Sequence, residues 1–293
     1  EPVNFNTGNF FVEARDFTIT DIAETWIDLI RTYNSQSLEG YAPIGAKWSS
    51  EITQTLSADE YGIIYWRRAD GSQVRFMKTE DGYFITDTSE YETLEETEEG
   101  YTIRLTDGTA YVFSAEGSLS RIEKNNGQQI IQLVYLETAN EEKTVARMEK
   151  IILPSGREIH IETNKEGQIT KIILPGNSTI RFSYTGNLLT AVTDANGQTT
   201  RYEYDEDGLM TAWYDGNGTC QVQNTYDNQA RVIAQTDANG GEYRLEYGDD
   251  YTVTTDAEGN TITYFRDEKQ RTSKVIDARG GVISFTYGIQ GTS

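Results

Sequence analysis

The sequence predicts an all-β protein built as a curved, spiralling antiparallel sheet of stacked hairpin repeats. Two observations indicate this fold. Short acidic turns recur about every twenty residues in the C-terminal half, and the segments between them alternate large apolar with polar residues. A repeat of this length is typical of architectures in which each unit buries its apolar face only against its neighbours. The period therefore favours a scaffold or container over an enzyme.

The acidic turns set the period. Their leading aspartates are separated by 21, 22, 19 and 21 residues, and each turn contains a glycine that supplies the positive φ of a tight hairpin. The aspartate and glycine pairs are Asp194 and Gly197, Asp215 and Gly218, Asp237 and Gly240, Asp256 and Gly259, and Asp277 and Gly280. Each unit is therefore expected to be a two-stranded hairpin.

Aromatic residues recur between the turns, as in Tyr202-Glu203-Tyr204. Successive strand side chains point to opposite faces, so this alternation gives one aromatic and one hydrated face. The recurring position holds Tyr184, Tyr204, Tyr226, Tyr247 and Tyr287, with Phe265 as a loose member. Buried, the row would be a ladder of cross-strand pairs; exposed, it could stack sugar rings. Its period favours the ladder, because a repeat's recurring apolar positions form a shared core.

N-terminal to the regular units, similar turn and strand motifs recur at less regular intervals. Ile151-Ile152-Leu153-Pro154 recurs as Ile172-Ile173-Leu174-Pro175, 21 residues later. We expect an N-terminal β domain over residues 1–60, degenerate hairpins over 61–150 and regular repeats over 151–293. From about residue 60 onward no segment has a convincing helical pattern.

The regular units resemble the YD repeats of the RHS/YD-repeat family. The matching residues are Tyr202-Glu203-Tyr204-Asp205 with Gly208-Leu209, Asn224-Thr225-Tyr226-Asp227 with Arg231-Val232, and the aspartate-led turns. A second match lies at the N-terminus, where residues 2–10, 16–19 and 31–35 resemble the domain that opens RHS-type shells. Together the two resemblances cover nearly the whole chain.

The resemblance implies a spiralling β-sheet that closes into a hollow shell around a C-terminal toxin domain. Shells of this kind usually end in a self-cleavage motif containing Asp-Pro. In this chain none of the four prolines follows an aspartate. The sequence therefore looks like the front part of a shell, or like a reduced relative without cargo.

The segment from Asp21 to Tyr33 supports two interpretations. Ile22, Trp26 and Leu29 fall at helical spacing, with Asp21 as an N-cap. The same segment as a strand would place Ile27, Leu29 and Tyr33 on one face. We expect the strand, because the resemblance at residues 31–35 favours it.

Composition excludes several classes of function. The formal net charge of −22 argues against binding nucleic acid, whose phosphates need Lys and Arg. One cysteine, Cys220, excludes an internal disulfide framework. No apolar stretch is long enough for a membrane span. The chain starts at Glu1 without a charged and apolar leader, so we expect that a signal peptide was removed or never present.

The residues show no catalytic constellation. The aspartate turns could form a calcium ladder, but Asp and Asn cap turns through their own side chains, which is the favoured interpretation. His160 lies between Ile159 and Ile161, on the face of Glu158 and Glu162, and is expected to point to solvent. Cys220 is interpreted as a small strand residue. We therefore expect no catalytic, cofactor or metal residues.

The sequence thus predicts a non-enzymatic shell segment of a polymorphic-toxin-type protein, secreted or at the cell surface, that encloses or presents a toxin domain. Its expected partners are polypeptide cargo or further shell repeats. Self-association through an open strand edge after Tyr287 is also expected. The alternative is a secreted or surface-displayed module that binds carbohydrate or protein, and an enzyme is the weakest option.

Overall fold

The computed structural model describes residues 3–22, 26–37, 43–86, 92–140 and 143–287. Two compact units make up the chain. Unit 1 combines residues 1–11 with residues 200–293, and unit 2 contains residues 12–199. The N-terminal residues therefore belong with the last repeats, although almost two hundred positions separate them in sequence. The domain boundaries expected at residues 60 and 150 stay a prediction.

Two small antiparallel sheets form the first part of unit 2. One consists of β1 (Phe11–Thr20), β2 (Trp26–Asn34) and β3 (Trp48–Ser50). A single 3-10 turn, η2 (Glu51–Thr53), leads into the second sheet of β4 (Thr55–Ala58), β5 (Ile64–Arg67), β6 (Gln73–Lys78) and β7 (Phe84–Thr86).

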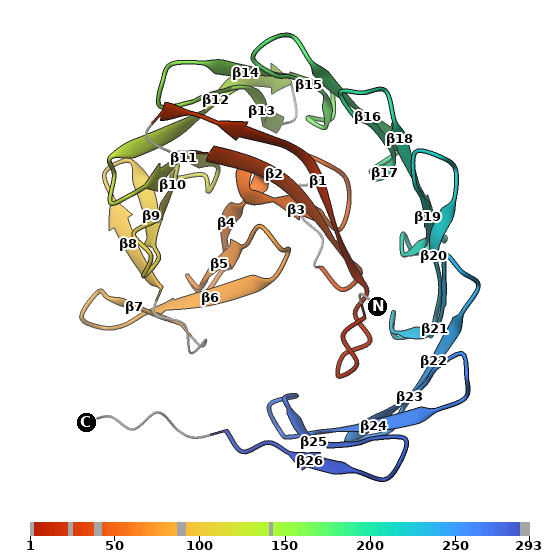
Figure 1. Cartoon of the computed structure of the whole chain (residues 1–293). Coiled ribbons are helices and arrows are strands. Elements are labelled where there is room, and N and C mark those ends of the chain that lie inside the picture. Colours follow the sequence, from red (N-terminus) through yellow and green to blue (C-terminus); the bar gives the residue numbers. More distant parts are fainter. Residues whose placement is uncertain (1–2, 23–25, 38–42, 87–91, 141–142, 288–293) are drawn as a thin grey trace. The chain divides into compact units, whose positions relative to one another are not determined.

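Nineteen described strands, β8 to β26, follow in chain order: β8 to β17 form an antiparallel sheet in unit 2, and β18 to β26 form an antiparallel sheet in unit 1 (Figure 1). Their bounds are β8 (Thr93–Thr97), β9 (Gly100–Arg104), β10 (Ala110–Phe113), β11 (Leu119–Lys124), β12 (Gln129–Asn140), β13 (Lys143–Ile152), β14 (Glu158–Thr163), β15 (Ile169–Ile173), β16 (Thr179–Thr185), β17 (Leu188–Thr193), β18 (Thr199–Tyr204), β19 (Met210–Tyr214), β20 (Cys220–Tyr226), β21 (Val232–Asp237), β22 (Glu242–Tyr247), β23 (Tyr251–Thr255), β24 (Thr261–Arg266), β25 (Thr272–Ile276) and β26 (Val282–Ser284). The predicted all-β antiparallel fold of stacked hairpins is confirmed. Across the described residues, no helix has the length and apolar character needed to cross a membrane.

The strand expected before Tyr33 is correct for the residues that are described, because β2 covers Trp26–Asn34; residues 23–25 lie outside the described ranges. Ile27, Leu29 and Tyr33 are all buried on one face of β2, as the strand interpretation requires. The segment forms a strand rather than a helix because β2 pairs with β3 in an antiparallel ladder. In that ladder Arg31 lies opposite Ser50 and Tyr33 opposite Trp48.

The strands of the sheet from β8 to β17 bury alternate side chains. In β16, Ile180 and Phe182 are buried while Arg181 and Ser183 are exposed. In β14, Ile159 and Ile161 are buried and His160 faces solvent. The core therefore lies along one face of the sheet, and most of the carboxylates occupy the other face or the turns. Exposed carboxylates of like charge discourage edge-to-edge association between copies.

Candidate functional site

Each aspartate-led turn is closed by its own carboxylate. Asp194 Oδ1 accepts hydrogen bonds from the backbone N–H of Asn196 at 2.9 Å and of Gln198 at 2.8 Å. The Gly197 N–H donates to the Asp194 carbonyl at 3.1 Å, and φ at Gly197 is +84°. A side chain that fixes its own loop in this way is an Asx-type cap, so the aspartate needs no ion to hold the turn.

The same cap recurs at all five predicted turns. Asp215, Asp237, Asp256 and Asp277 each accept from the N–H groups two and four residues further on. It also recurs at the other end of the hairpins, where Asp205, Asp227 and Asp267 lead the turns. The sequence places Asp205 and Asp227 in the Tyr-Asp motif and predicts a hairpin turn at Asp207-Gly208, but Asp267 was missed. The signal of this second set was the spacing from the aspartate to a later Gly, or to Ala230 or Gln270, which carry φ of +59° and +60°.

When a hairpin is taken as the strand that carries the recurring tyrosine together with the strand that follows it, these tyrosines tie each hairpin to the one before it. The hydroxyl of Tyr184 donates to the carbonyl of Ile169 at 2.7 Å, Tyr226 to Met210 at 2.8 Å, Tyr247 to Val232 at 2.5 Å and Tyr287 to Thr272 at 2.7 Å. Tyr135, which sequence reasoning missed, donates to the Leu119 carbonyl at 2.9 Å. Burial raises the pKa of Tyr226 and of Tyr247 above the ordinary tyrosine value.

Most of these tyrosines stand at a β-bulge. The register of Tyr184, Tyr204 and Tyr226 with the following strand shifts by one residue at the tyrosine. In each case the extra residue belongs to the following strand, so the tyrosine stands opposite the bulge. Tyr184, Tyr204, Tyr226 and Tyr247 are half-buried, and Tyr287 is 43% exposed.

Phe265 does not belong to this row. In β24 the bulge falls between Phe265 and Arg266, so Arg266 takes the tyrosine's place. Its guanidinium donates to the Thr252 Oγ1 at 2.7 Å and to the Gly248 carbonyl at 2.8 Å. The preceding hairpin has a shorter loop, from Gly248 to Asp250, and an unshifted register. A longer cationic side chain therefore satisfies carbonyls that a tyrosine satisfies elsewhere.

Two arginines connect the acidic turns to the tyrosine row. Arg231 pairs with Asp227 at 2.7 Å, and its guanidinium carbon lies 4.3 Å from the ring centroid of Tyr247. Arg271 repeats this arrangement with Asp267 at 2.6 Å and with Tyr287 at 4.1 Å. Each arginine thus links the turn of one hairpin with the tyrosine of the next through an ion pair and a cation–π contact.

A Tyr247→Phe variant should show what one of these ties contributes. Removing the hydroxyl leaves the Val232 carbonyl without the donor 2.5 Å away, so we expect a loss of about 1 kcal/mol in the free energy of unfolding. Tyr287→Phe is the matched control, because water reaches its exposed ring and can replace the hydroxyl. Urea unfolding measures both variants, and an equal loss at the two positions would contradict the prediction.

The turn carboxylates should make repeat stability depend on acid. Hydrogen bonding from the Arg271 side chain lowers the pKa of Asp267, and that of the Asn260 side chain lowers the pKa of Asp256. A carboxyl with a depressed folded pKa contributes stability above its unfolded value of 3.8, and the contribution is lost as pH falls through the folded pKa. We therefore expect Asp267→Asn to lower the urea midpoint at pH 7, and wild type and variant to converge below pH 3.8. A difference that persists undiminished at pH 2.5 would rule this out.

An N-terminal loop, defined here as residues 3–10, docks on the hairpins of unit 1. The Gly8 carbonyl accepts from the Val232 N–H at 2.9 Å, and the Asn6 side chain donates to the Thr272 Oγ1 at 3.0 Å. A Cβ on Gly8 would come within 2.4 Å of the Arg231 Cβ. Glycine is therefore required where the loop approaches the Tyr-Asp turn.

Unit 2 shows the same kind of contact. The Pro43 carbonyl accepts from the Ile169 N–H at 2.7 Å, and the Ala46 N–H donates to the Asn187 carbonyl at 2.7 Å. The Leu56 N–H donates to the Gly117 carbonyl at 2.9 Å. The N-terminal segments thus bind backbone groups of the repeats beside their bulges and turns, where the regular ladder is interrupted.

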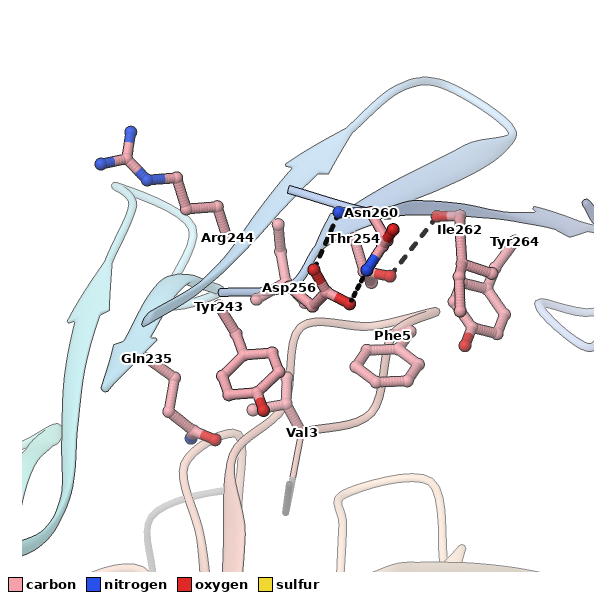
Figure 2. Close-up of a pocket in the computed structure, with 11 residues that line it drawn as sticks. Val3, Phe5, Gln235, Tyr243, Arg244, Thr254, Asp256, Asn260, Ile262 and Tyr264 are labelled. Carbon is pink, nitrogen blue, oxygen red and sulfur yellow. Dashed lines mark hydrogen bonds between the residues drawn. The ribbon is translucent and has the colours of Figure 1, made fainter. Parts of the chain in front are cut away.

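A pocket of about 210 Å³ lies between the N-terminal loop and strands β21 to β24 (Figure 2). Phe5 and Tyr264 form one side with ring centroids 4.9 Å apart, and Tyr243 stands across from them. Asp256 and Asn260, from the turn between β23 and β24, lie above the rings, while Arg244 points away. Sequence reasoning missed this pocket, because Phe5 reaches it only through the long-range docking of the loop.

The other sequence candidates remain apart from one another. The side chain of His160 is 55% exposed and lies 3.4 Å from Glu158, as its outward position predicted. Cys220 begins β20 with a half-buried thiol. Within the described ranges, no cluster of three or more His, Cys, Asp or Glu side chains is arranged to hold a metal ion.

Comparisons with protein families agree with the repeat geometry. Residues 1–76 match the family model described as Domain of unknown function (DUF6531), and residues 100–219 match the model Teneurin YD-shell. A match to a domain of unknown function is thus followed along the chain by a match to the YD-shell model. The two matches support the resemblance to the RHS/YD-repeat family.

Several curated proteins resemble this chain. The tRNA nuclease WapA of Bacillus subtilis (strain 168) is 27% identical over 218 residues, which cover 74% of this chain and 9% of WapA. Teneurin-1 of Gallus gallus is 28% identical over 103 residues, or 34% of this chain and 4% of teneurin-1. The chain thus spans less than a tenth of the length of these relatives.

Solved structures with a similar arrangement include those titled TcdB2-TccC3 and the Photorhabdus luminescens Tc holotoxin pore. The first has a TM-score of 0.39 at 12% identity and the second a TM-score of 0.37 at 10% identity. In each case the match covers 91% of this chain, and 15% and 18% of the other chain respectively.

Proposed function

We propose that this chain is a non-enzymatic wall segment of an RHS/YD-repeat shell that encloses or presents a C-terminal toxin domain. The observation that supports the proposal is the repeated tie between hairpins. A tyrosine hydroxyl bound to a carbonyl of the previous hairpin recurs at Tyr184, Tyr226, Tyr247 and Tyr287, and self-capped acidic turns recur over the same stretch of the chain. Such a sheet is suited to continuous coverage rather than to catalysis at one point.

The two faces of the sheet support the same role. Buried apolar side chains alternate with exposed polar ones, so a wall built from these strands presents different surfaces to its two sides. The net charge of −22 helps to keep a large sheet soluble. In this proposal the chain acts outside the cell that makes it, secreted or at the cell surface, and works mechanically by shielding a polypeptide.

Enzymatic activity is not part of the proposal. The name of WapA describes a tRNA nuclease, but the matched segment is only 9% of that protein. The repeat tyrosines favour a structural role over sugar stacking, because the hydroxyls of Tyr184, Tyr226 and Tyr247 bind backbone carbonyls. Carbohydrate or protein binding by the same sheet is the alternative, supported by the pocket beside Tyr243.

The source gene and its full product test the proposal. We expect the reading frame to continue beyond Ser293 through more repeats into an unrelated domain. In the full natural polypeptide, that domain should resist a protease that digests it rapidly when it is expressed alone. A frame that stops at Ser293, or a domain cut equally fast in both contexts, would overturn the enclosing function and favour the binding alternative.

A further inference from the structure

We propose that the pocket between the N-terminal loop and β21 to β24 binds the cationic side chain of a basic polypeptide segment, an arginine or a lysine. The cage, defined here as Phe5, Tyr243, Tyr264 and Asp256, combines three aromatic rings with one carboxylate. Rings attract cations through the negative charge on their faces, and Arg and Lys are the side chains that exploit this.

The arrangement of the rings supports a flat or compact cation. Phe5 and Tyr264 are tilted by 33° to each other at 4.9 Å, and Tyr243 faces them across the cavity (Figure 2). The cavity of about 210 Å³ has room for the head of one long side chain. The cage is assembled from both ends of unit 1, since Phe5 comes from the N-terminal loop and the other rings from β22 and β24.

The electrostatics favour a positive occupant. The hydrogen bond from the Asn260 side chain lowers the pKa of Asp256, so its carboxylate stays charged at neutral pH. Arg244 is the only cation among the lining residues, and its Nε donates to Glu242 Oε1 at 2.6 Å on the opposite face of β22. The net charge of −22 complements a basic segment over a longer range.

The hydrogen bonding of the lining residues disfavours a sugar. Asp256 and Asn260 bind each other, with Asn260 Nδ2 donating to Asp256 Oδ2 at 2.9 Å. The Thr254 hydroxyl donates to the Ile262 carbonyl at 3.4 Å, and the Gln235 amide donates to Asn224 Oδ1 at 2.8 Å. A polyol needs several such groups for its hydroxyls, whereas a cation needs ring faces and one negative charge. The pocket meets the second requirement.

The test compares two peptides that differ in charge but hardly in shape. The full chain is titrated by calorimetry or NMR with acetyl-Gly-Arg-Gly-amide and with the same peptide carrying citrulline, at 0.15 M salt. We expect the arginine peptide to bind about fivefold to thirtyfold more tightly, the size that cation–π contacts with two or three rings give. Equal affinity for both peptides would overturn the proposal.

Variants at Tyr243 distinguish the contribution of an aromatic ring face to binding from that of an apolar side chain. Tyr243→Leu should reduce arginine-peptide binding at least about threefold, and Tyr243→Phe should retain it, because Phe keeps the ring face. Glu246→Gln is the charge control, since it removes a carboxylate from the opposite face of the same strand. Binding that falls with Glu246→Gln and survives Tyr243→Leu would show diffuse charge attraction and contradict the cage.

The peptide comparison on the unaltered chain stands even if Tyr243→Leu fails to fold. Glucose and N-acetylglucosamine serve as the sugar probes, and binding of either in preference to the arginine peptide would also overturn the proposal. The inference is independent of the proposed shell function: the peptide titration examines this chain alone, whereas the shell function is tested by protection of a following domain.

Discussion

Gly117→Ala should be among the most damaging single substitutions in this chain. Gly117 has φ +84°, and an added Cβ would stand 2.0 Å from the carbonyl oxygen of Leu56. The clashing atom belongs to the backbone, which cannot rotate away as a side chain can. The start of β4 must therefore move away from the turn between β10 and β11 that contains Gly117. The Leu56 N–H then also loses its 2.9 Å bond to the Gly117 carbonyl. We expect a loss of about 3 kcal/mol or more in the free energy of unfolding.

Gly156→Ala is the matched control for this prediction. Gly156 has φ +83°, nearly the same conformation, but nothing lies within 4 Å of the position its Cβ would take. Only the cost of a left-handed residue remains, about 1–2 kcal/mol. Urea unfolding of the two variants isolates the contact with Leu56, and hydrogen exchange of the Leu56 amide locates it. Equal losses would mean that the docked strand contributes nothing.

Arg31→Leu should cause the second large loss. The guanidinium of Arg31 donates to Asp16 at 2.5 and 2.9 Å, and the two side chains are only 2% and 4% exposed. The same guanidinium lies 4.8 Å from the Trp48 ring centroid. Removing it leaves the Asp16 carboxylate buried without its cation, which costs about 3–5 kcal/mol. The loss is measured as the shift in the urea unfolding midpoint and its free energy.

The double variant Arg31→Leu with Asp16→Leu separates charge from packing. It should recover a substantial part of the loss, because no buried charge then lacks a partner. Arg15→Gln tests an exposed pair, since Arg15 lies 4.0 Å from Asp28 with 62% of its side chain exposed; we expect a change within about 0.5 kcal/mol. A double variant less stable than Arg31→Leu alone would refute the account of an unpaired carboxylate.

The repeat half of the fold could be predicted from local residues alone. Asp194 and Gly197 define a hairpin turn within a few positions, and the 21-residue recurrence multiplies that signal. The alternation around Tyr204 indicates a strand and its faces. These features depend on backbone geometry between near neighbours, and the residue types report it directly.

The contacts of the N-terminal loop could not be predicted in this way. Gly8 meets Val232 through a backbone carbonyl and a backbone N–H, and such groups are present at every position and leave no trace in residue type. The cage depends on that docking, since Phe5 joins Tyr264 across more than 250 positions. Arg266 was missed for a related reason: the bulge shifts the register by one, and its partners follow from the shorter loop at Gly248.

The tyrosine hydrogen bonds relate the order of the hairpins to the order in which the chain is synthesised. Each hydroxyl reaches back fifteen or sixteen residues to a carbonyl that precedes it in the chain, as Tyr184 reaches Ile169 and Tyr226 reaches Met210. A ribosome releases the acceptor before the donor, so every new hairpin emerges next to a finished docking point. We therefore expect hairpins to be added one at a time during synthesis from the N-terminus, each docking on the hairpin made before it.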